Sequence, residues 1–113
     1  MFSGKEIKVL LKNQAKEVYE KLEKDNTKDA KTLLNSINRA IAILKSDPQY
    51  GLPIAKQLIP IEYKKEGVQN LYRIELSNFW RMLYTIEGNK VEIFLFILSI
   101  NDHKGYNKLF GYK

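Results

Sequence analysis

Hydrophobic and polar residues alternate in two short runs, 71–76 and 80–86, with a polar break at Ser77-Asn78 between them. This is the pattern of a β-hairpin. Paired antiparallel residues must share a face of the sheet, so the pattern also indicates the length of the loop. A two-residue loop would place charged residues opposite apolar ones and mix charge into the apolar face. A three-residue loop, 77–79, pairs Glu75 with Arg81 instead. The pattern therefore predicts the longer loop, with Arg73, Glu75 and Arg81 together on one face of the hairpin.

Two amphipathic helices are predicted ahead of this hairpin. The first follows Asn13, its predicted N-cap, and runs to about Lys24. The second begins after a break and a second cap at 25–27 and ends near Ser46, because Pro48 disfavours a helical residue before it. Two helices joined so closely pack as an antiparallel hairpin, and their shared apolar stripe needs a sheet to cover it.

Two further strands complete the predicted sheet. Residues 5–11 form the first. In residues 91–100, odd and even positions alike are apolar apart from Glu92 and Ser99, as expected of a central strand that is covered on both faces. A turn centred on residues 88–89 leads into the latter and pairs Glu87 with Lys90. The order β-α-α-β-β-β predicts a single α+β domain of 113 residues. Its twisted, mostly antiparallel sheet packs on the helical hairpin, with the first strand beside the last and a short C-terminal tail or helix.

The stretch 47–69 has no regular pattern and is rich in proline and glycine. Irregular segments of this length inside a compact domain are usually functional or disordered. Two interpretations remain open for it. It is a mobile surface excursion, or it is a basic loop that lies along a bound polyanion through Lys56, Lys64 and Lys65.

The composition of the chain limits the kinds of partner and of chemical site that we expect. The formal net charge of +6 suggests a polyanionic partner only weakly, since many lysines fall on solvated helix faces. The absence of cysteine excludes disulfides and thiol nucleophiles, and a lone His103 cannot build a multi-histidine site, so no metal or cofactor is expected. No apolar run approaches the ~20 residues that span a bilayer, and the N-terminus lacks a signal-peptide core. We therefore expect a cytoplasmic protein.

The polar side chains have structural interpretations as well as functional ones. Glu75 opposite Arg81 is compatible with an ordinary cross-strand charge pair. Tyr106 has the spacing of a C-terminal helical turn docked on the sheet, and His103 is compatible with an idle surface position. The functional interpretation rests on placement, because both tail residues follow the end of the central strand, whose neighbour carries Arg81.

Three segments together resemble the RelE/ParE superfamily of toxins from type II toxin–antitoxin modules. They are LYRIEL at 71–76, WRMLY at 80–84 and the tail HKGY at 103–106, within the β-α-α-β-β-β order. The resemblance covers nearly the whole chain, and the hairpin is its most specific part. The RelE-like branch implies a metal-independent endoribonuclease that cleaves mRNA on the ribosome, with a cognate antitoxin as partner in a heterocomplex. The alternatives are a ParE-type inhibitor of DNA gyrase and an inactive family member; His103 with Tyr106 favours the nuclease branch.

The resemblance also implies roles for individual residues. Arg81 and Arg73 would clamp the scissile phosphate, because a guanidinium fork suits its non-bridging oxygens. His103 falls where relatives place an acid, and Tyr106 would stack on a base or assist proton transfer. Glu75, often basic in RelE itself, would act as the general base or neutralise Arg81 by pairing with it. Further contacts to the RNA are implied for Lys56, Lys64, Lys65, Lys104 and Tyr112.

Overall fold

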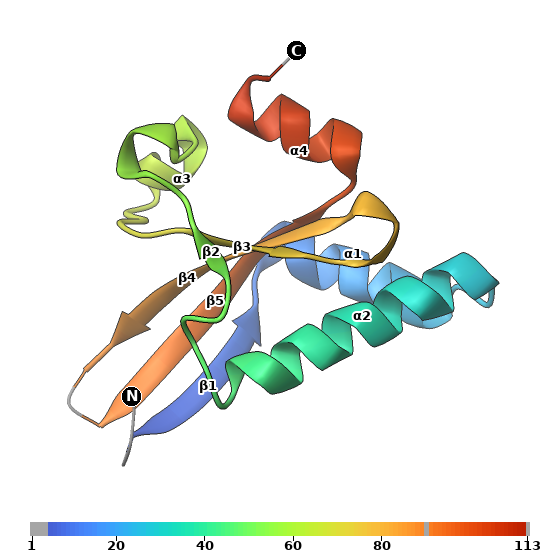
Figure 1. The fold of residues 1–113 in the computed structure, drawn as a ribbon, viewed down its shortest axis with the longest axis horizontal. Coiled ribbons are helices and arrows are strands. Elements are labelled where there is room, and N and C mark those ends of the chain that lie inside the picture. The colour runs from blue at the N-terminus through green and yellow to red at the C-terminus, as the bar shows by residue number, and fades with distance from the viewer. Residues whose placement is uncertain (1–4, 90, 113) are drawn as a thin grey trace.

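The computed structural model describes residues 5–89 and 91–112, which form a five-stranded mixed sheet with helices on both faces (Figure 1). The strands are β1 (Glu6–Leu11), β2 (Leu52–Pro53), β3 (Tyr72–Glu75), β4 (Arg81–Gly88) and β5 (Glu92–Asn101), in the spatial order β1-β5-β4-β3-β2. β1 runs parallel to β5, and the other pairs are antiparallel. The predicted α+β class is confirmed, as is the position of the first strand beside the last.

The helices are α1 (Asn13–Lys24), α2 (Lys28–Leu44), α3 (Ile61–Lys65) and α4 (His103–Phe110), with 3-10 turns η1 (Lys56–Leu58) and η2 (Ser77–Phe79). Figure 1 shows the α1–α2 hairpin along one side of the sheet and α3 and α4 near its other end. Among the described residues, no helix has the length and apolar character needed to cross a membrane.

The register of the hairpin is the predicted one. Glu75 pairs with Arg81, and the backbone N–H of Leu76 donates to the carbonyl of Trp80 at 2.8 Å, which closes the three-residue loop. Ile74, Met82 and Tyr84 then pack against the helical hairpin. Arg73, Glu75 and Arg81 occupy the opposite face, together with Leu83 of the second core. Steric alternation favours this register over that of a two-residue loop.

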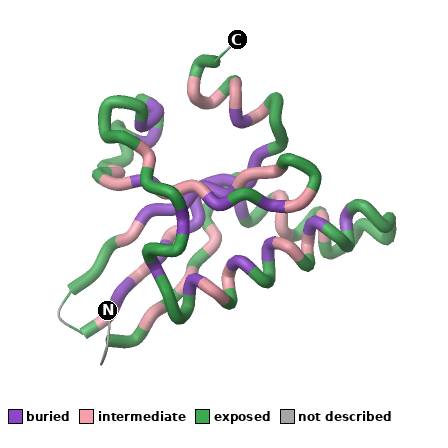
Figure 2. The backbone as a smooth tube through the Cα atoms, in the orientation of Figure 1, coloured by how far each residue is buried: buried purple, intermediate pink, exposed green. Residues whose placement is uncertain are grey.

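The main core lies between the helical hairpin and the sheet. Figure 2 shows buried positions at regular intervals along α2 and throughout the central strands. The helices contribute Ala15, Leu33, Ile37, Ala40 and Leu44, and the sheet contributes Ile74, Leu76, Met82, Tyr84, Ile93, Leu95, Ile97 and Ile100. Burial of this continuous apolar layer is what fixes the helices against the sheet.

The predicted N-cap of the first helix is wrong, whereas that of the second is confirmed. Lys12 is the N-cap of α1, and Asn13 has a positive φ of 40° and makes no capping hydrogen bond. The cause is β1, because the N–H of Lys12 still donates to the carbonyl of Ile97 at 3.0 Å and holds the chain in the sheet. In α2, the Thr27 side chain accepts a hydrogen bond from the N–H of Ala30.

The stretch 47–69 is more ordered than its sequence indicates, so the expectation of an irregular excursion is corrected. Leu52–Pro53 forms the edge strand β2, and α3 brings Tyr63 into a second core. The Tyr84 hydroxyl anchors the start of the stretch, donating to the carbonyl of Pro48 at 2.7 Å and accepting from the N–H of Gly51 at 3.0 Å. Elements of two to five residues are too short to show a periodicity.

The second core fills the opposite face of the sheet beneath α3 and α4. It consists of Ile59, Tyr63, Leu71, Leu83, Leu98 and Tyr106. A β-bulge in β5 lies next to this second core. Leu83 pairs with Ser99, but the next residue of β4 pairs with Ile97, so Leu98 is an extra residue in β5. This bulge turns Ser99 and Asn101 away from the main core and toward α3 and α4.

The turn before β5 also differs from its predicted form. Glu87 pairs with Phe94, and the turn is closed by the Asn89 N–H, which donates to the carbonyl of Glu92 at 2.9 Å. The predicted partner of Glu87, Lys90, lies outside the described residues. The side chain of Asn89 also accepts from the N–H groups of Val91 and Glu92. These bonds favour a wider loop than the two-residue turn expected.

Candidate functional site

Two arginines and one glutamate lie side by side on the face of the hairpin opposite the main core. Arg81 Nε donates to Glu75 Oε1 at 3.3 Å. Arg73 Nε lies 3.0 Å from Glu75 Oε2, but its N–H is not aimed at this oxygen, so that contact is ionic without a hydrogen bond. Two guanidinium groups share a single carboxylate, and one positive charge therefore remains unbalanced at this place.

Tyr106 of α4 connects the two arginines. Its hydroxyl accepts a hydrogen bond from Arg73 Nη1 at 3.2 Å, and the guanidinium carbon of Arg81 lies 4.6 Å from the ring centroid. The hydrogen bond to Tyr106 raises the pKa of Arg73 above its ordinary value, and the Glu75 carboxylate adds to the effect. Tyr106 is only 4% exposed, so its ring serves to position the two arginines.

Arg81 retains hydrogen-bonding capacity. Within the described part of the chain, neither terminal nitrogen of its guanidinium has a hydrogen-bond partner, and only Nε contacts Glu75. A guanidinium group whose outer edge is free can donate two parallel hydrogen bonds to a phosphate. Arg81 lies opposite Asn101 in the sheet, and Asn101 is two residues before the start of α4. The free edge is thus at the end of the sheet where the tail residues begin.

The C-terminal aromatic residues extend the site. Tyr112 is 49% exposed and stacks on Phe110, with ring centroids 5.7 Å apart. Phe110 in turn packs on Tyr106 at 4.6 Å. Tyr112 thus offers a half-exposed aromatic face beside the arginine cluster, as an RNA-binding residue requires.

His103 lies one helical turn before Tyr106 but lines a different hollow. Its Nε2 is 3.2 Å from Asn107 Nδ2, on the exposed side of α4. With Lys104 it borders a hollow of about 600 Å³ whose other walls are Asn78, Phe79 and Asp102. The structure therefore brings His103 and Lys104 to the same end of the sheet as Arg81 without placing them in the arginine cluster.

The three lysines of the stretch 47–69 are all exposed, and two of them line the same groove. Lys56 and Lys64 line a shallow groove of about 360 Å³ together with Gln57 and Gln69. Lys65 is the last residue of α3 and lies outside that groove. A groove with two ammonium groups, two amides and no carboxylate suits a phosphate backbone.

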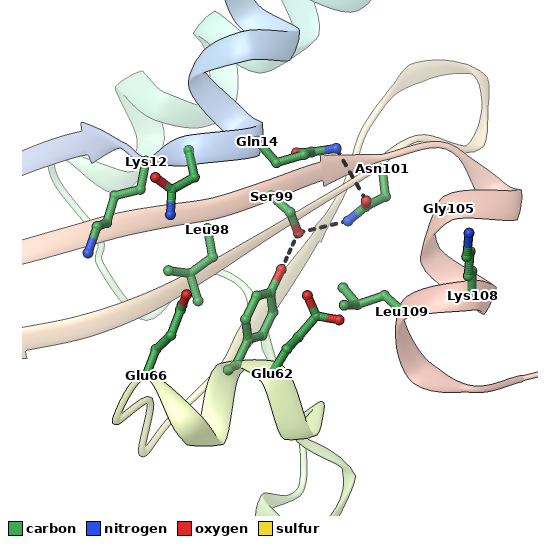
Figure 3. A pocket seen from close by; sticks show the side chains of 12 residues that line it. Lys12, Gln14, Glu62, Glu66, Leu98, Ser99, Asn101, Gly105, Lys108 and Leu109 are labelled. Atoms are coloured by element: carbon green, nitrogen blue, oxygen red, sulfur yellow. Dashed lines mark hydrogen bonds between the residues drawn. The ribbon is translucent and has the colours of Figure 1, made fainter.

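A separate pocket of about 390 Å³ lies between β5, α3, α4 and the start of α1 (Figure 3). Its floor is a buried polar network. The Tyr63 hydroxyl donates to Ser99 Oγ at 2.6 Å, and Asn101 Nδ2 donates to the same oxygen at 2.8 Å. Gln14 closes the edge of β5 by bonding to both the N–H and the carbonyl of Ile100, each at 2.8 Å.

None of the residues predicted for the site lines this pocket. Figure 3 shows its rim carrying both charge signs, with carboxylates on α3 and ammonium groups on the other sides. The charged residues are Lys12, Glu62, Glu66 and Lys108. No sequence pattern indicates the network, because its members come from three distant segments and Ser99 faces it only through the bulge in β5.

Stability is expected to fall at alkaline pH because of two buried tyrosines. Burial raises the pKa of Tyr63 to about 12 and that of Tyr84 to about 12. An unfolded tyrosine titrates near ~10, so between ~10 and ~12 the unfolded chain loses protons that the native state keeps. The free energy of unfolding should be unaffected by these groups below pH ~10 and decline above it. Urea denaturation across this pH range measures the slope.

The matched variants for this prediction are Tyr84→Phe, which should decline less steeply, and Tyr50→Phe, which should follow the original curve. Tyr50 is an exposed tyrosine near the same stretch of chain. An unchanged slope in a protein carrying both Tyr63→Phe and Tyr84→Phe would contradict the assignment.

Comparison with models of protein families and with curated proteins found no match to this chain. Within residues 5–89 and 91–112, no three or more histidine, aspartate or glutamate side chains are grouped so that they could hold a metal ion.

Proposed function

We propose that this protein is the toxin of a type II toxin–antitoxin pair, an endoribonuclease of the RelE kind that cleaves mRNA on the translating ribosome. The observation that supports it is the cluster of Arg73, Arg81 and Tyr106. These residues come from two strands and the C-terminal helix, at the positions that the resemblance marks as functional. The proposal places the protein in the cytoplasm, with an antitoxin that covers the site in the resting complex.

The proposed reaction is a transfer within the RNA. The 2′-oxygen attacks the adjacent phosphorus, the bond from phosphorus to the 5′-oxygen breaks, and the products are a 2′,3′-cyclic phosphate and a 5′-hydroxyl. The free edge of Arg81 would stabilise the charge that develops on the non-bridging oxygens, with Arg73 as a second cation. A proton must leave the 2′-hydroxyl and another must reach the 5′-oxygen. His103 is the proposed acid for the latter step.

We expect the charge of Glu75 to lower the affinity of the two arginines for a phosphate. Its carboxylate contacts the Nε atoms of both guanidinium groups, so it is a negative charge next to any phosphate that they bind. We expect Glu75→Gln to raise the affinity for a short single-stranded RNA by roughly threefold to tenfold, because a repulsive charge is removed next to the phosphate. Fluorescence anisotropy at fixed salt measures this. Glu87→Gln, at the far end of β4, is the control and should bind as the original protein does.

The cleavage rate of the same variant separates the two roles of Glu75. Tighter binding with cleavage retained identifies a carboxylate that only restrains the arginines. Tighter binding with cleavage reduced by 10²-fold or more would identify Glu75 as the general base, since that is the size of a typical acid–base contribution. An unchanged affinity would contradict the arrangement of charges described above.

The experiment that tests the proposed function is primer extension on a defined mRNA in a reconstituted translation reaction. The expected result is new 5′ ends inside codons of the ribosomal A site, dependent on both ribosomes and the purified protein. They should be lost with Arg81→Ala and with His103→Ala. An intact message would overturn the proposal, and a parallel supercoiling assay with purified gyrase would then test the ParE-type activity.

A further inference from the structure

Phe79 is held in a conformation that phenylalanine rarely adopts. It has a φ of 64° and follows Asn78, which has a φ of 56°. The left-handed region is natural for glycine and tolerated by asparagine, but it brings the Cβ atom of a bulky residue too close to the backbone. The Phe79 side chain is also 77% exposed, so packing gives nothing in return. Strain of this kind, without compensating burial, points to a function of the side chain.

The loop that carries Phe79 is nevertheless firmly placed. The N–H of Ser77 donates to Ser36 Oγ on α2 at 3.1 Å, and the N–H of Trp80 donates to the carbonyl of Ser77 at 3.2 Å. Leu76 and Trp80 close the loop on either side. The aromatic ring is therefore presented on a fixed support, and binding to it would not require the loop to become ordered.

The surroundings of Phe79 favour a nucleic acid over a protein partner. Among the residues that the structure describes, Phe79 is the one apolar residue lining a hollow of about 600 Å³, and Asn78, Asp102, His103 and Lys104 supply the other walls. Asp102 Oδ1 is engaged as the cap of α4, accepting from the N–H of Gly105 at 2.8 Å. An aromatic anchor for a protein would be expected among other apolar side chains. A single exposed ring beside an imidazole and an ammonium group suits a base with its phosphate.

We propose that Phe79 is a stacking platform for one unpaired base of single-stranded RNA, with the adjoining phosphate held by Lys104. The ring faces the hollow that His103 also lines, so the stacked nucleotide lies next to the proposed acid. This inference rests on the proposed function and names a part of its substrate: a nucleotide that is splayed out of the RNA beside the scissile phosphate. Stacking on an aromatic ring tolerates any base, so Phe79 would contribute affinity and orientation more than sequence selectivity.

The test uses the full chain without ribosomes and a short single-stranded oligoribonucleotide that carries 2-aminopurine, whose fluorescence is quenched by stacking. We expect binding with quenching for the original protein and for Phe79→Trp. Phe79→Asn should lose the quenching and bind about tenfold more weakly, the loss expected for one stacked base. Its thermal midpoint should be equal or higher, because asparagine accepts the left-handed conformation better than phenylalanine.

Tyr50→Asn removes another exposed aromatic residue and is the control, which should bind and quench as the original protein does. The inference is overturned if Phe79→Asn keeps both affinity and quenching, in which case the exposed ring is a contact for a protein. It is also overturned if Phe79→Asn lowers the thermal midpoint, because the ring would then have a structural role. The assay contains no ribosome, so stacking without ribosome-dependent cleavage would leave the inference standing and overturn the proposed function alone.

Discussion

Replacing Arg81 with alanine is expected to reduce ribosome-dependent cleavage by about 10²- to 10³-fold while the fold persists. The activity should fall because Arg81 holds the guanidinium edge that is free to meet the non-bridging phosphate oxygens. Stability should change by no more than ~1 kcal/mol, since the side chain belongs to neither core and its ion pair with Glu75 is partly solvated. Primer extension measures the cleavage, and urea denaturation measures the stability.

Two further variants make this result specific. Arg81→Lys keeps the charge but lacks the planar fork, so we expect it to recover only part of the lost activity. Arg39→Ala removes an exposed arginine from α2, on the other side of the sheet, and should cleave as the original protein does. If Arg81→Ala cleaves normally while remaining folded, the arginine cluster is not the centre of the reaction.

Replacing Tyr106 with alanine is expected to lower the free energy of unfolding by about 3–5 kcal/mol, the usual effect of removing a buried aromatic ring. Tyr106 is almost fully buried in the second core, and α4 has few other anchors on the sheet. Its ring also supports Arg81 and its hydroxyl supports Arg73. We therefore expect cleavage to be lost together with the structure of α4. Urea denaturation followed by circular dichroism measures the change.

The Tyr106→Phe variant separates positioning from proton transfer. It keeps the ring beneath Arg81 and loses only the bond to Arg73, so we expect a fall in cleavage of no more than about tenfold, with most of the stability retained. A loss greater than 10²-fold in a folded variant would show that the hydroxyl takes part in proton transfer. Tyr112→Ala is the control for the aromatic tail, and its stability should change by less than ~1 kcal/mol because the ring is half exposed.

The resting ion pairs give the site an internal restraint. Glu75 stands opposite Arg81 in the ladder, and it also contacts Arg73 two residues before it on the same strand. A phosphate bound at the free edge of Arg81 would lie next to this carboxylate and would be repelled by its charge. The strength of RNA binding is thus expected to depend on how readily Glu75 moves away, which the Glu75→Gln measurements address directly.

The sequence by itself determined the hairpin and the set of residues on each of its faces. The period of two along β3 and β4 favours a three-residue loop over a two-residue one, because only the former keeps charge out of the apolar face, and Glu75 pairs with Arg81 accordingly. The two long helices followed for the same reason, because the stripe of α2 recurs over 17 residues. Patterns of this kind are local and strong enough to be read without knowledge of the fold.

The tertiary structure alone decided which side chains meet at the site. The bulge at Leu98 depends on how β4 pairs with β5, and it turns Ser99 toward α3 instead of the main core. Tyr106 contacts both arginines only because α4 folds back over strands that lie far away in the sequence. The left-handed conformation of Phe79, in the loop between β3 and β4, contradicts its intrinsic preference. Long-range pairing and strain leave no periodic signal in the chain, so they appear only when the elements are packed together.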